Sequence, residues 1–259
     1  MTGSAIDSLQ GKRAVVTGTS SGIGRAVAEQ LIAAGSIVYG ADIDEDVGQA
    51  MAGQDRGPGN GAFRFTKVDF TVPDQLDEWL TGVYADAGHI DVLCNVVGIS
   101  DVLPIEQTDD AILERTMAIN FYTPFRICRW VAPSMKRDGG VILNVASELA
   151  FVAQPGFSAY CASKGALVSF TRALALEMSP YNVRVNVLCP GPTETPMLNA
   201  EFETFGDKKS ERSQALGAIP LNRFGDPEEI AKIAMFLVSD HASFMQGAAV
   251  MADGGKTLL

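Results

Sequence analysis

The sequence predicts an α/β fold in which one parallel sheet of about seven strands carries helices on both faces. Short, almost continuously apolar runs alternate with longer segments of helical periodicity, and strands covered on both faces have that composition. With 259 residues, 47% of them hydrophobic, the chain can bury a substantial core. No internal repeat, low-complexity tract or linker divides it, so residues 1–259 are expected to form a single domain.

Seven runs have the length and the apolar character of buried strands. Each is bounded by turn residues or by a segment with helical spacing, which sets its limits along the chain. The strands are expected at residues 13–17, 37–41, 62–69, 91–97, 140–146, 183–189 and 248–252.

Six longer segments lie between these runs and have apolar side chains at helical spacing. Several of them begin at residues that favour a helix N-terminus, such as Asp44, Pro73, Asp109 and Pro227. The helices are expected at residues 24–34, 44–52, 73–87, 109–135, 159–178 and 227–237.

The charge balance argues against a nucleic-acid-binding surface. The chain has 31 acidic and 20 basic side chains, a formal net charge of −11, whereas such a surface needs clustered Lys and Arg. A small-molecule ligand is therefore expected. No metal is expected either, because His89 and His241 stand apart from each other and from the cysteines. The cysteines lie in apolar segments without a C-x-x-C pair and are expected to be buried, reduced thiols: Cys94, Cys128, Cys161 and Cys189.

Hydropathy favours a cytoplasmic protein with no membrane partner. The N-terminal stretch has no apolar run long enough for a signal peptide. No segment reaches the ~18 apolar residues that a membrane-spanning helix needs.

The stretch "VVTGTSSGIGRAVAEQL" places a glycine-rich turn between the first strand and the first helix. Gly18, Gly22 and Gly24 have the spacing G-x-x-x-G-x-G, which differs from the common G-x-G-x-x-G but occupies the same place. Glycine lets the backbone turn tightly and approach a pyrophosphate, which the helix N-terminus then attracts. Ser20 and Ser21 add hydroxyl donors. The turn therefore predicts a Rossmann-type, doubly wound sheet that binds a dinucleotide.

Asp42 predicts that the dinucleotide is NAD and not NADP. It ends the second strand about 20 residues after the glycine turn, where an acid can hold the ribose hydroxyls and repel a 2′-phosphate. Residues 19–21 contain no Lys or Arg that would offset the repulsion. The alternative is that Asp42, Asp44, Glu45 and Asp46 only form a solvated, acidic helix start.

Further motifs follow at regular intervals along the whole chain. They are "TGTSSGIG" from Thr17, "VDF" ending at Phe70, "NVVG" from Asn95, "MAIN" ending at Asn120, Ser147 thirteen residues before Tyr160, "CPGPTETPM" from Cys189 and "ADGG" from Ala252. With these motifs the sequence resembles the short-chain dehydrogenase/reductase family. The resemblance implies that NAD is bound by Gly18, Ser20, Ser21, Gly22, Ile23, Gly24, Asp42, Asp69, Phe70, Asn95, Gly98, Tyr160, Lys164, Pro190, Gly191, Thr193 and Thr195.

One motif departs from the family pattern. Where the family usually has N-N-A-G, this chain has Asn95, Val96, Val97 and Gly98. Asn95 is expected to keep its place beside the cofactor. The amide lost at position 96 puts in doubt the hydrogen-bonded brace behind the glycine turn, and an apolar repacking is expected there without loss of activity.

Tyr160 and Lys164 are four residues apart on the predicted helix 159–178 and are therefore neighbours on its surface. Taken alone, such a pair is usually no more than a lysine stem lying on a ring. Alcohol oxidation needs a base, and a free tyrosine with a pKa of ~10 is a poor one at neutral pH. An ammonium about 4 Å away at an effective dielectric near 20 favours the phenolate by roughly 4 kcal/mol, or about 3 pK units. A lowered pKa of Tyr160 is therefore expected.

The resemblance implies the remaining catalytic roles. Lys164 also holds the nicotinamide ribose, Ser147 hydrogen-bonds the substrate oxygen, and Asn120 supports a water chain. A helix-bending role is the alternative for Asn120, and an ordinary turn serine is the alternative for Ser147.

Residues 193–220 form a long polar segment with interspersed apolar side chains, and we expect a lid over the substrate. An amphipathic surface helix is the alternative. The substrate is expected to contact Ser147, Leu149, Gln154, Tyr160 and Met197. The pocket walls are expected to be mostly apolar, with Leu149, Phe151, Val152, Gln154, Phe157, Met197 and Leu198.

The sequence thus predicts an NAD-dependent dehydrogenase for a small to medium, mostly apolar secondary alcohol, diol or ketone, cyclic ones included. Two alternatives are a 3-oxoacyl carrier-protein reductase, which Asp42 and the net charge disfavour, and a non-catalytic dinucleotide-binding regulator. The helix 158–178 is apolar nearly all round, and together with the resemblance this predicts a homotetramer, with a dimer as the alternative.

Overall fold

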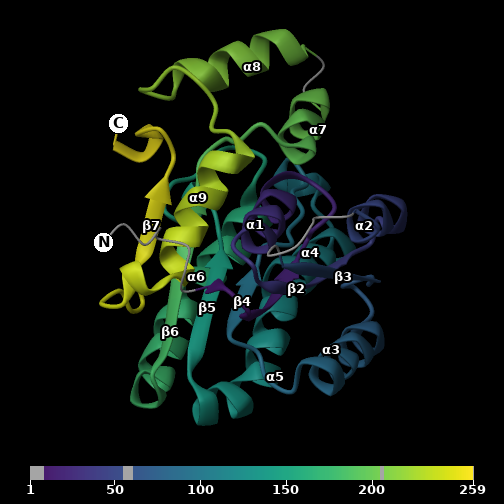
Figure 1. Cartoon of the computed structure of the whole chain (residues 1–259). Helices are drawn as coiled ribbons and strands as arrows, with labels where there is room; N and C mark the ends of the chain where they lie inside the picture. The colour runs from purple at the N-terminus through teal and green to yellow at the C-terminus, as the bar shows by residue number, and fades with distance from the viewer. Residues whose placement is uncertain (1–8, 55–60, 205–206, 259) are drawn as a thin grey trace.

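A seven-stranded parallel sheet forms the centre of the molecule (Figure 1). The computed structural model describes residues 9–54, 61–204 and 207–258. The strand order is β3-β2-β1-β4-β5-β6-β7, so the chain reverses direction across the sheet between β1 and β4. The predicted fold class is confirmed. The strands are β1 (Arg13–Thr17), β2 (Ile37–Asp42), β3 (Ala62–Lys67), β4 (Val92–Asn95), β5 (Gly140–Val145), β6 (Val183–Pro190) and β7 (Ala249–Ala252).

Two of these strands are shorter than the sequence predicts by two residues or more. β4 ends at Asn95 because the next two amide groups leave the ladder: Val96 N and Val97 N both donate to Thr17 Oγ1, at 3.0 and 3.1 Å. β3 ends at Lys67: Val68 N still donates to Asp42 O, but Asp69 N donates to the Gln75 side chain at 2.8 Å. The apolar character of the sequence continues beyond the ladder in both places, so hydropathy alone overestimates the strand length.

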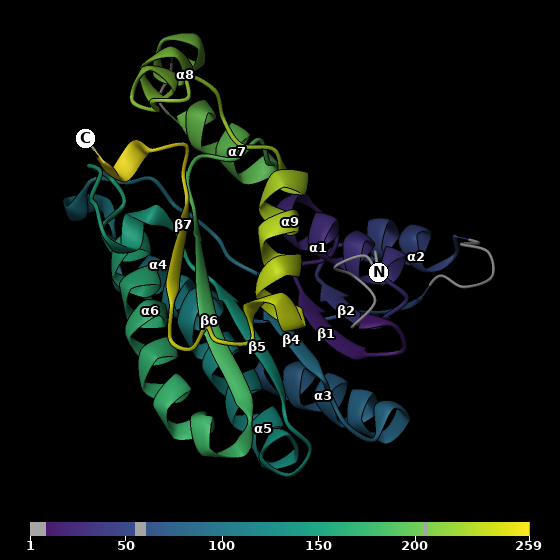
Figure 2. The same ribbon diagram turned by 60° about the vertical axis from the view of Figure 1, so that its left-hand side comes forward.

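Helices cover both faces of the sheet (Figure 2). One apolar core packs α1 (Gly22–Ala33), α2 (Glu45–Ala52) and α9 (Pro227–Val238) on one face. The other packs α3 (Pro73–Ala87), α5 (Thr123–Asp138) and α6 (Ser158–Met178) on the opposite face. The carboxyl ends of the strands are left open to carry a site.

The helix predicted at 109–135 is interrupted. It consists of α4 (Asp110–Met117), a π-helical turn η3 (Ala118–Tyr122) and α5. Asn120 lies in the π turn and is fully buried. A π turn of this kind is frequent at functional sites, and the helical periodicity of the sequence does not reveal it.

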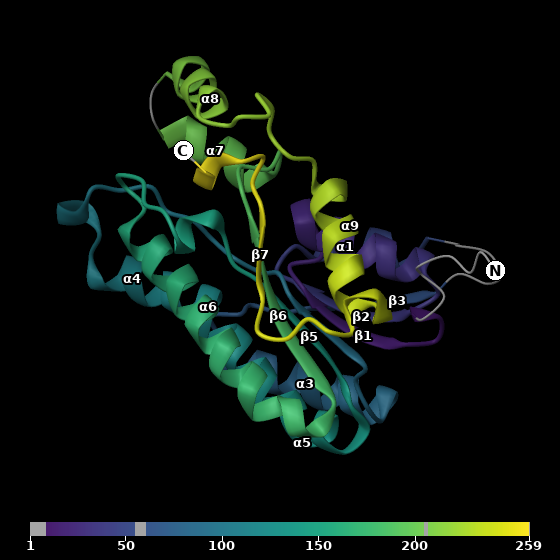
Figure 3. The ribbon, with the colours of Figure 1, turned by 90° about the vertical axis from the view of Figure 1, so that its left-hand side faces the viewer.

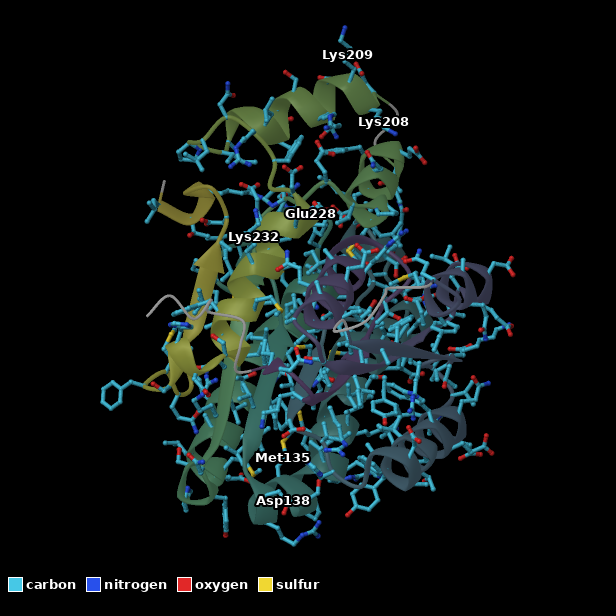
Figure 4. The ribbon with its side chains drawn as sticks, viewed as in Figure 1. Met135, Asp138, Lys208, Lys209, Glu228 and Lys232 are labelled. Atoms are coloured by element: carbon cyan, nitrogen blue, oxygen red, sulfur yellow. The ribbon has the colours of Figure 1, made fainter. Side chains whose placement is uncertain are left out.

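The predicted lid contains two helices, α7 (Pro196–Thr204) and α8 (Lys208–Gly217). They lie beyond the carboxyl ends of the strands, next to the C-terminal segment (Figure 3). Leu198, Phe202, Ile219 and Phe224 form a small apolar core of their own beneath them. Figure 4 shows Lys208 and Lys209 at the start of α8, and Met135 and Asp138 of α5 at the far end of the molecule. The segment is therefore largely helical, and its function as a substrate lid stays a prediction.

Three cysteines are buried, and Cys161 is partly buried; all four are free thiols. Among the helices of residues 9–54, 61–204 and 207–258, none combines the length and the hydropathy of a membrane-spanning segment.

Candidate active site

A cleft of about 670 Å³ opens along the carboxyl ends of the strands, where doubly wound sheets bind ligands. It extends from the glycine turn and the end of β2, past β4 and β5, to α7. Most of the predicted site residues line it: Gly18, Ser21, Gly22, Ile23, Gly24, Asp42, Asp69, Phe70, Gly98, Ser147, Leu149, Gln154, Tyr160, Lys164, Pro190, Gly191, Thr193, Thr195 and Met197. Ser20, Asn95 and Asn120 lie outside this lining.

The glycine turn is packed so closely that larger residues cannot replace its glycines. Gly18 has φ +76° and Gly22 has φ +51°, which L side chains rarely adopt. A Cβ atom on Gly24 would lie 1.9 Å from the carbonyl oxygen of Gly18. The turn therefore brings its backbone directly to the cleft floor, as pyrophosphate binding requires.

Asp42 ties the end of β2 to this turn. Its Oδ2 accepts from Ser20 N at 3.0 Å and its Oδ1 from Asp44 N at 3.1 Å. Each carboxylate oxygen has two acceptor sites, so one on each oxygen remains for ribose hydroxyls in the cleft. The side chain of Asp42 is therefore oriented for the predicted contact.

The hydroxyl of Ser20 does not face the cleft. It donates to the carbonyl oxygen of Asp44 at 3.0 Å, and the residue is 6% exposed. The contact of Ser20 with the pyrophosphate stays a prediction; in this structure the start of α2 accepts its hydroxyl proton. Ser20 positions Asp42 through its backbone amide.

The side chain of Asn95 is also directed away from the cleft. Its Nδ2 donates to Asn144 Oδ1 at 2.8 Å inside the sheet, and Asn95 is 1% exposed. The place of Asn95 beside the cofactor, at the end of β4, stays a prediction, while its side chain is bound by the neighbouring strand β5. Val96 and Val97 pack into the two opposite apolar cores. The predicted apolar repacking is thus present, and the brace to β1 is made by the Thr17 hydroxyl.

Asn120 joins three segments behind the cleft. Its Oδ1 accepts from Ile99 N at 2.9 Å, and its Nδ2 donates to Ile99 O at 2.9 Å and to Ser163 Oγ at 3.0 Å. These bonds support the structural alternative for Asn120, because the chain uses both amide hydrogens and one of the two acceptor sites of Oδ1. They also fix Gly98, whose absent side chain leaves room for the Lys164 ammonium: a Cβ there would lie 3.2 Å from Nζ.

Tyr160 and Lys164 meet in the cleft as the spacing predicts, but their electrostatics differ from the prediction. Lys164 Nζ lies 5.7 Å from the centre of the Tyr160 ring and donates to Val145 O at 3.0 Å. Burial, and then the negative charges of Glu148 and Glu201, raise the pKa of Tyr160, while the Ser147 hydroxyl opposes them. Burial lowers the pKa of Lys164 to about 8. The expected lowering of the Tyr160 pKa is therefore wrong for the chain by itself.

Three charged residues of the site were not predicted. Glu148 follows Ser147 directly in η4 (Glu148–Ala150), Glu201 lies on α7, and Lys256 begins η7 (Lys256–Leu258); all three line the cleft. A fourth, Arg115 of α4, also lines it and is paired with Asp101. Lys256 Nζ lies 3.0 Å from Glu148 Oε1. Only Glu148 had a usable signal, since it follows the end of β5 at the edge where ligands bind. The predicted pocket of mostly apolar walls thus has a charged end.

Glu201 should make the stability of the protein depend on pH. Burial raises the pKa of this carboxyl from 4.5 to about 7; Glu148 raises it further, against Ser100 and Lys256. Between these two values the folded state binds more protons than the unfolded state, so stability falls as the pH rises. The wild type should therefore lose free energy of unfolding relative to the Glu201→Gln variant, which has no carboxyl there. The difference between the two should shift by about 1–2 kcal/mol in favour of the variant from pH 5.5 to pH 8. Urea denaturation at both pH values measures this, with the exposed Glu106→Gln as control. If the variant and the wild type differed in stability by the same amount at pH 5.5 and at pH 8, the burial of the Glu201 carboxyl would be contradicted.

Comparisons with known proteins agree with this geometry. A family model described as "Enoyl-(Acyl carrier protein) reductase" matches residues 18–257. The chain is 34% identical over 247 residues to the cyclopentanol dehydrogenase of Comamonas testosteroni, covering 95% of this chain and 97% of that protein. It is 36% identical over 248 residues to the NAD-dependent glycerol dehydrogenase of Listeria innocua serovar 6a, covering 95% and 94%.

Solved structures have the same architecture. The ligand-free aldohexose dehydrogenase of Thermoplasma acidophilum matches with a TM-score of 0.87 at 29% identity, covering 98% of this chain and 96% of that one. Fold, site and full-length similarity together confirm the resemblance seen in the sequence motifs. This chain belongs to the short-chain dehydrogenase/reductase family.

Proposed function

We propose that the chain is an NAD-dependent dehydrogenase that oxidises a secondary alcohol or diol, or reduces the corresponding ketone, with Tyr160 as the general acid and base. The observation that carries the proposal is the meeting of Ser147, Tyr160 and Lys164 in the cleft that begins at the glycine turn and Asp42. The relatives whose names include cyclopentanol and glycerol dehydrogenase support an alcohol substrate.

The reaction uses the charges of the site. Bound NAD⁺ supplies the hydride acceptor and a positive charge. Tyr160 takes the hydroxyl proton of the substrate as the hydride leaves, and it returns that proton in the reductive direction. Burial keeps the Tyr160 phenol protonated in the chain alone, so this state is prepared to donate a proton to a ketone. Oxidation needs the added positive charges of Lys164 and the cofactor to favour the phenolate.

The end of β2 supports NAD over NADP. A 2′-phosphate would lie against the Asp42 carboxylate, which costs affinity. Lys67 is distant from the glycine turn in sequence, but β3 places it next to Asp42 in the sheet register. Lys67 Nζ lies 3.3 Å from Glu45 Oε2 and is not part of the cleft lining. Lys67 is therefore already paired with Glu45 and does not offset the repulsion between Asp42 and a 2′-phosphate.

A carrier-protein reductase remains the second candidate, since the matching family model is described in those terms. That activity normally uses NADPH and a basic docking face. Asp42 and the net charge of −11 oppose both. A non-catalytic regulator is the third candidate, and it does not need Ser147, Tyr160 and Lys164 in one cleft.

The cofactor assignment is tested by NADH or NADPH formation at 340 nm. The wild type should turn over secondary alcohols or diols with NAD⁺ at a kcat/KM about 100-fold or more above that with NADP⁺. Asp42→Ser should reduce this ratio to about tenfold or less, because it removes the charge and leaves a hydroxyl at the ribose. Asp46→Ser, in the adjoining helix, is the matched control and should leave the ratio unchanged. Turnover with NADP⁺ alone would refute the role of Asp42.

A further inference from the structure

The charged end of the cleft has no role in the reaction described above. Glu148, Glu201 and Lys256 come from three separate elements and converge beside Ser147 and Tyr160. Glu148 is 4% exposed, and burying a carboxylate costs several kcal/mol unless its oxygens are satisfied. Both oxygens are indeed used, one by Lys256 and one by Ser147. The chain therefore maintains a buried ion pair directly at the reacting centre.

The two carboxylates oppose the chemistry of Tyr160. Their negative charges both raise its pKa, which lowers the fraction of Tyr160 present as the phenolate that alcohol oxidation needs as its base. Because the charges of Glu148 and Glu201 work against the oxidation, we expect these side chains to have another role in the site. An ionised carboxylate only accepts hydrogen bonds, so Glu148, which is paired with Lys256, can bind a donor on the substrate.

The hydrogen bonds of Ser147 identify where such a donor binds. Its Oγ accepts from Leu149 N at 3.1 Å and lies 3.0 Å from Glu148 Oε2. A serine hydroxyl has one proton, and the ionised Glu148 can only accept it. Ser147 therefore has no proton left to donate to the reacting oxygen of the substrate. A substrate hydroxyl that donates to Glu148 in its place would release that proton.

We infer that the substrate is a vicinal diol or a longer polyol whose second hydroxyl donates to Glu148, beside Lys256 and Glu201, and so frees the Ser147 hydroxyl for the reacting oxygen. This inference rests on the proposed alcohol oxidation at Tyr160. A monohydroxy alcohol has no second hydroxyl to donate to Glu148, so its reacting oxygen has to compete with Glu148 for the proton of the Ser147 hydroxyl. Lys256 can donate to a further hydroxyl oxygen, which suits a substrate with neighbouring hydroxyl groups.

Matched pairs of substrates test the inference. NADH formation is measured for 1,2-cyclopentanediol, as cis and trans isomers, against cyclopentanol, and for 2,3-butanediol against 2-butanol. The better diol isomer should exceed its monohydroxy partner in kcat/KM by about tenfold or more, as expected for one hydrogen bond to a charged group. Equal or faster turnover of the monohydroxy alcohols would overturn the inference while leaving the proposed dehydrogenase intact.

Variants assign the preference to Glu148. Glu148→Gln keeps the size of the side chain but removes the charge, and it should reduce the ratio of diol to monohydroxy kcat/KM to about threefold or less. Lys209→Gln is the control, since Lys209 lies at the outer end of α8 (Figure 4) and outside the cleft lining. It should leave the ratio unchanged. A ratio that survives Glu148→Gln would overturn the assignment.

A cationic substrate is the competing explanation for two carboxylates. 2-Aminocyclopentanol is therefore included in the panel, and its preference over the diol would overturn the inference. If no alcohol or ketone reacts with either cofactor, the proposed function fails. Calorimetric titration of the diol and of cyclopentanol, with and without NAD⁺, then decides the inference separately, and equal binding of the two would overturn it.

Discussion

Replacing Tyr160 with phenylalanine should reduce kcat for every alcohol by about 10³-fold or more, within the range that loss of a general acid and base produces. The change removes one oxygen from a side chain that is 9% exposed and lies edge-on to Phe157, so the packing of the ring is kept. The Tyr160 phenol exchanges the substrate proton, and phenylalanine has no hydroxyl with which to do so. NAD⁺ affinity should stay within about threefold of wild type, because the glycine turn and Asp42 are untouched.

Tyr181→Phe is the matched control, since Tyr181 is 42% exposed in η5 (Ser179–Tyr181), the short helix after α6, and lies outside the cleft lining. Steady-state kinetics and NAD⁺ titration of both variants separate loss of chemistry from loss of binding. Unchanged turnover in Tyr160→Phe would refute the mechanism. Lost turnover together with lost NAD⁺ binding would point instead to a collapse of the cleft.

Replacing Gly24 with alanine should lower the free energy of unfolding by about 2–4 kcal/mol, at the upper end of overpacking effects. The new Cβ would lie 1.9 Å from Gly18 O and 3.2 Å from Thr17 O. The turn cannot move away easily, because Gly18 N donates to Ala41 O at 2.8 Å and joins it to β2. Any shift also displaces the backbone that faces the pyrophosphate. NAD⁺ affinity should therefore fall by about 100-fold.

Gly82→Ala provides the control for this substitution. Gly82 lies inside α3, and a Cβ there would meet nothing within 4 Å. Alanine is a better helix former than glycine, so this variant should gain about 0.5–1 kcal/mol. Urea denaturation and NAD⁺ titration measure both variants. If Gly24→Ala were as stable as wild type, the close contact between α1 and the turn would be wrong.

Local patterns account for the predictions that the structure confirms. The seven apolar runs became the seven strands, because a parallel sheet buried on both faces needs continuous hydrophobic strands. The glycine spacing placed Gly18, Gly22 and Gly24 at the cleft, because only glycine permits that turn. Tyr160 and Lys164 share one face of α6 through helical periodicity alone.

Contacts between distant segments account for the side-chain arrangements that the sequence did not reveal. The side chain of Asn95 faces Asn144 of β5, and the Ser20 hydroxyl faces the start of α2. Neither partner is near in sequence, so no spacing rule could select it. The π turn at Asn120 likewise follows from its bonds to Ile99 and Ser163, not from the apolar periodicity of the segment.

The sequence by itself determined the sheet, the dinucleotide turn and the pair of Tyr160 and Lys164, because each depends on residues close together in the chain. The tertiary structure alone decided the electrostatics of the site. Burial and the carboxylates of Glu148 and Glu201 set the protonation of Tyr160, and Lys256 joins them from the C-terminal segment. Charge interactions depend on distance and burial in three dimensions. The separation of two residues along the chain specifies neither of these.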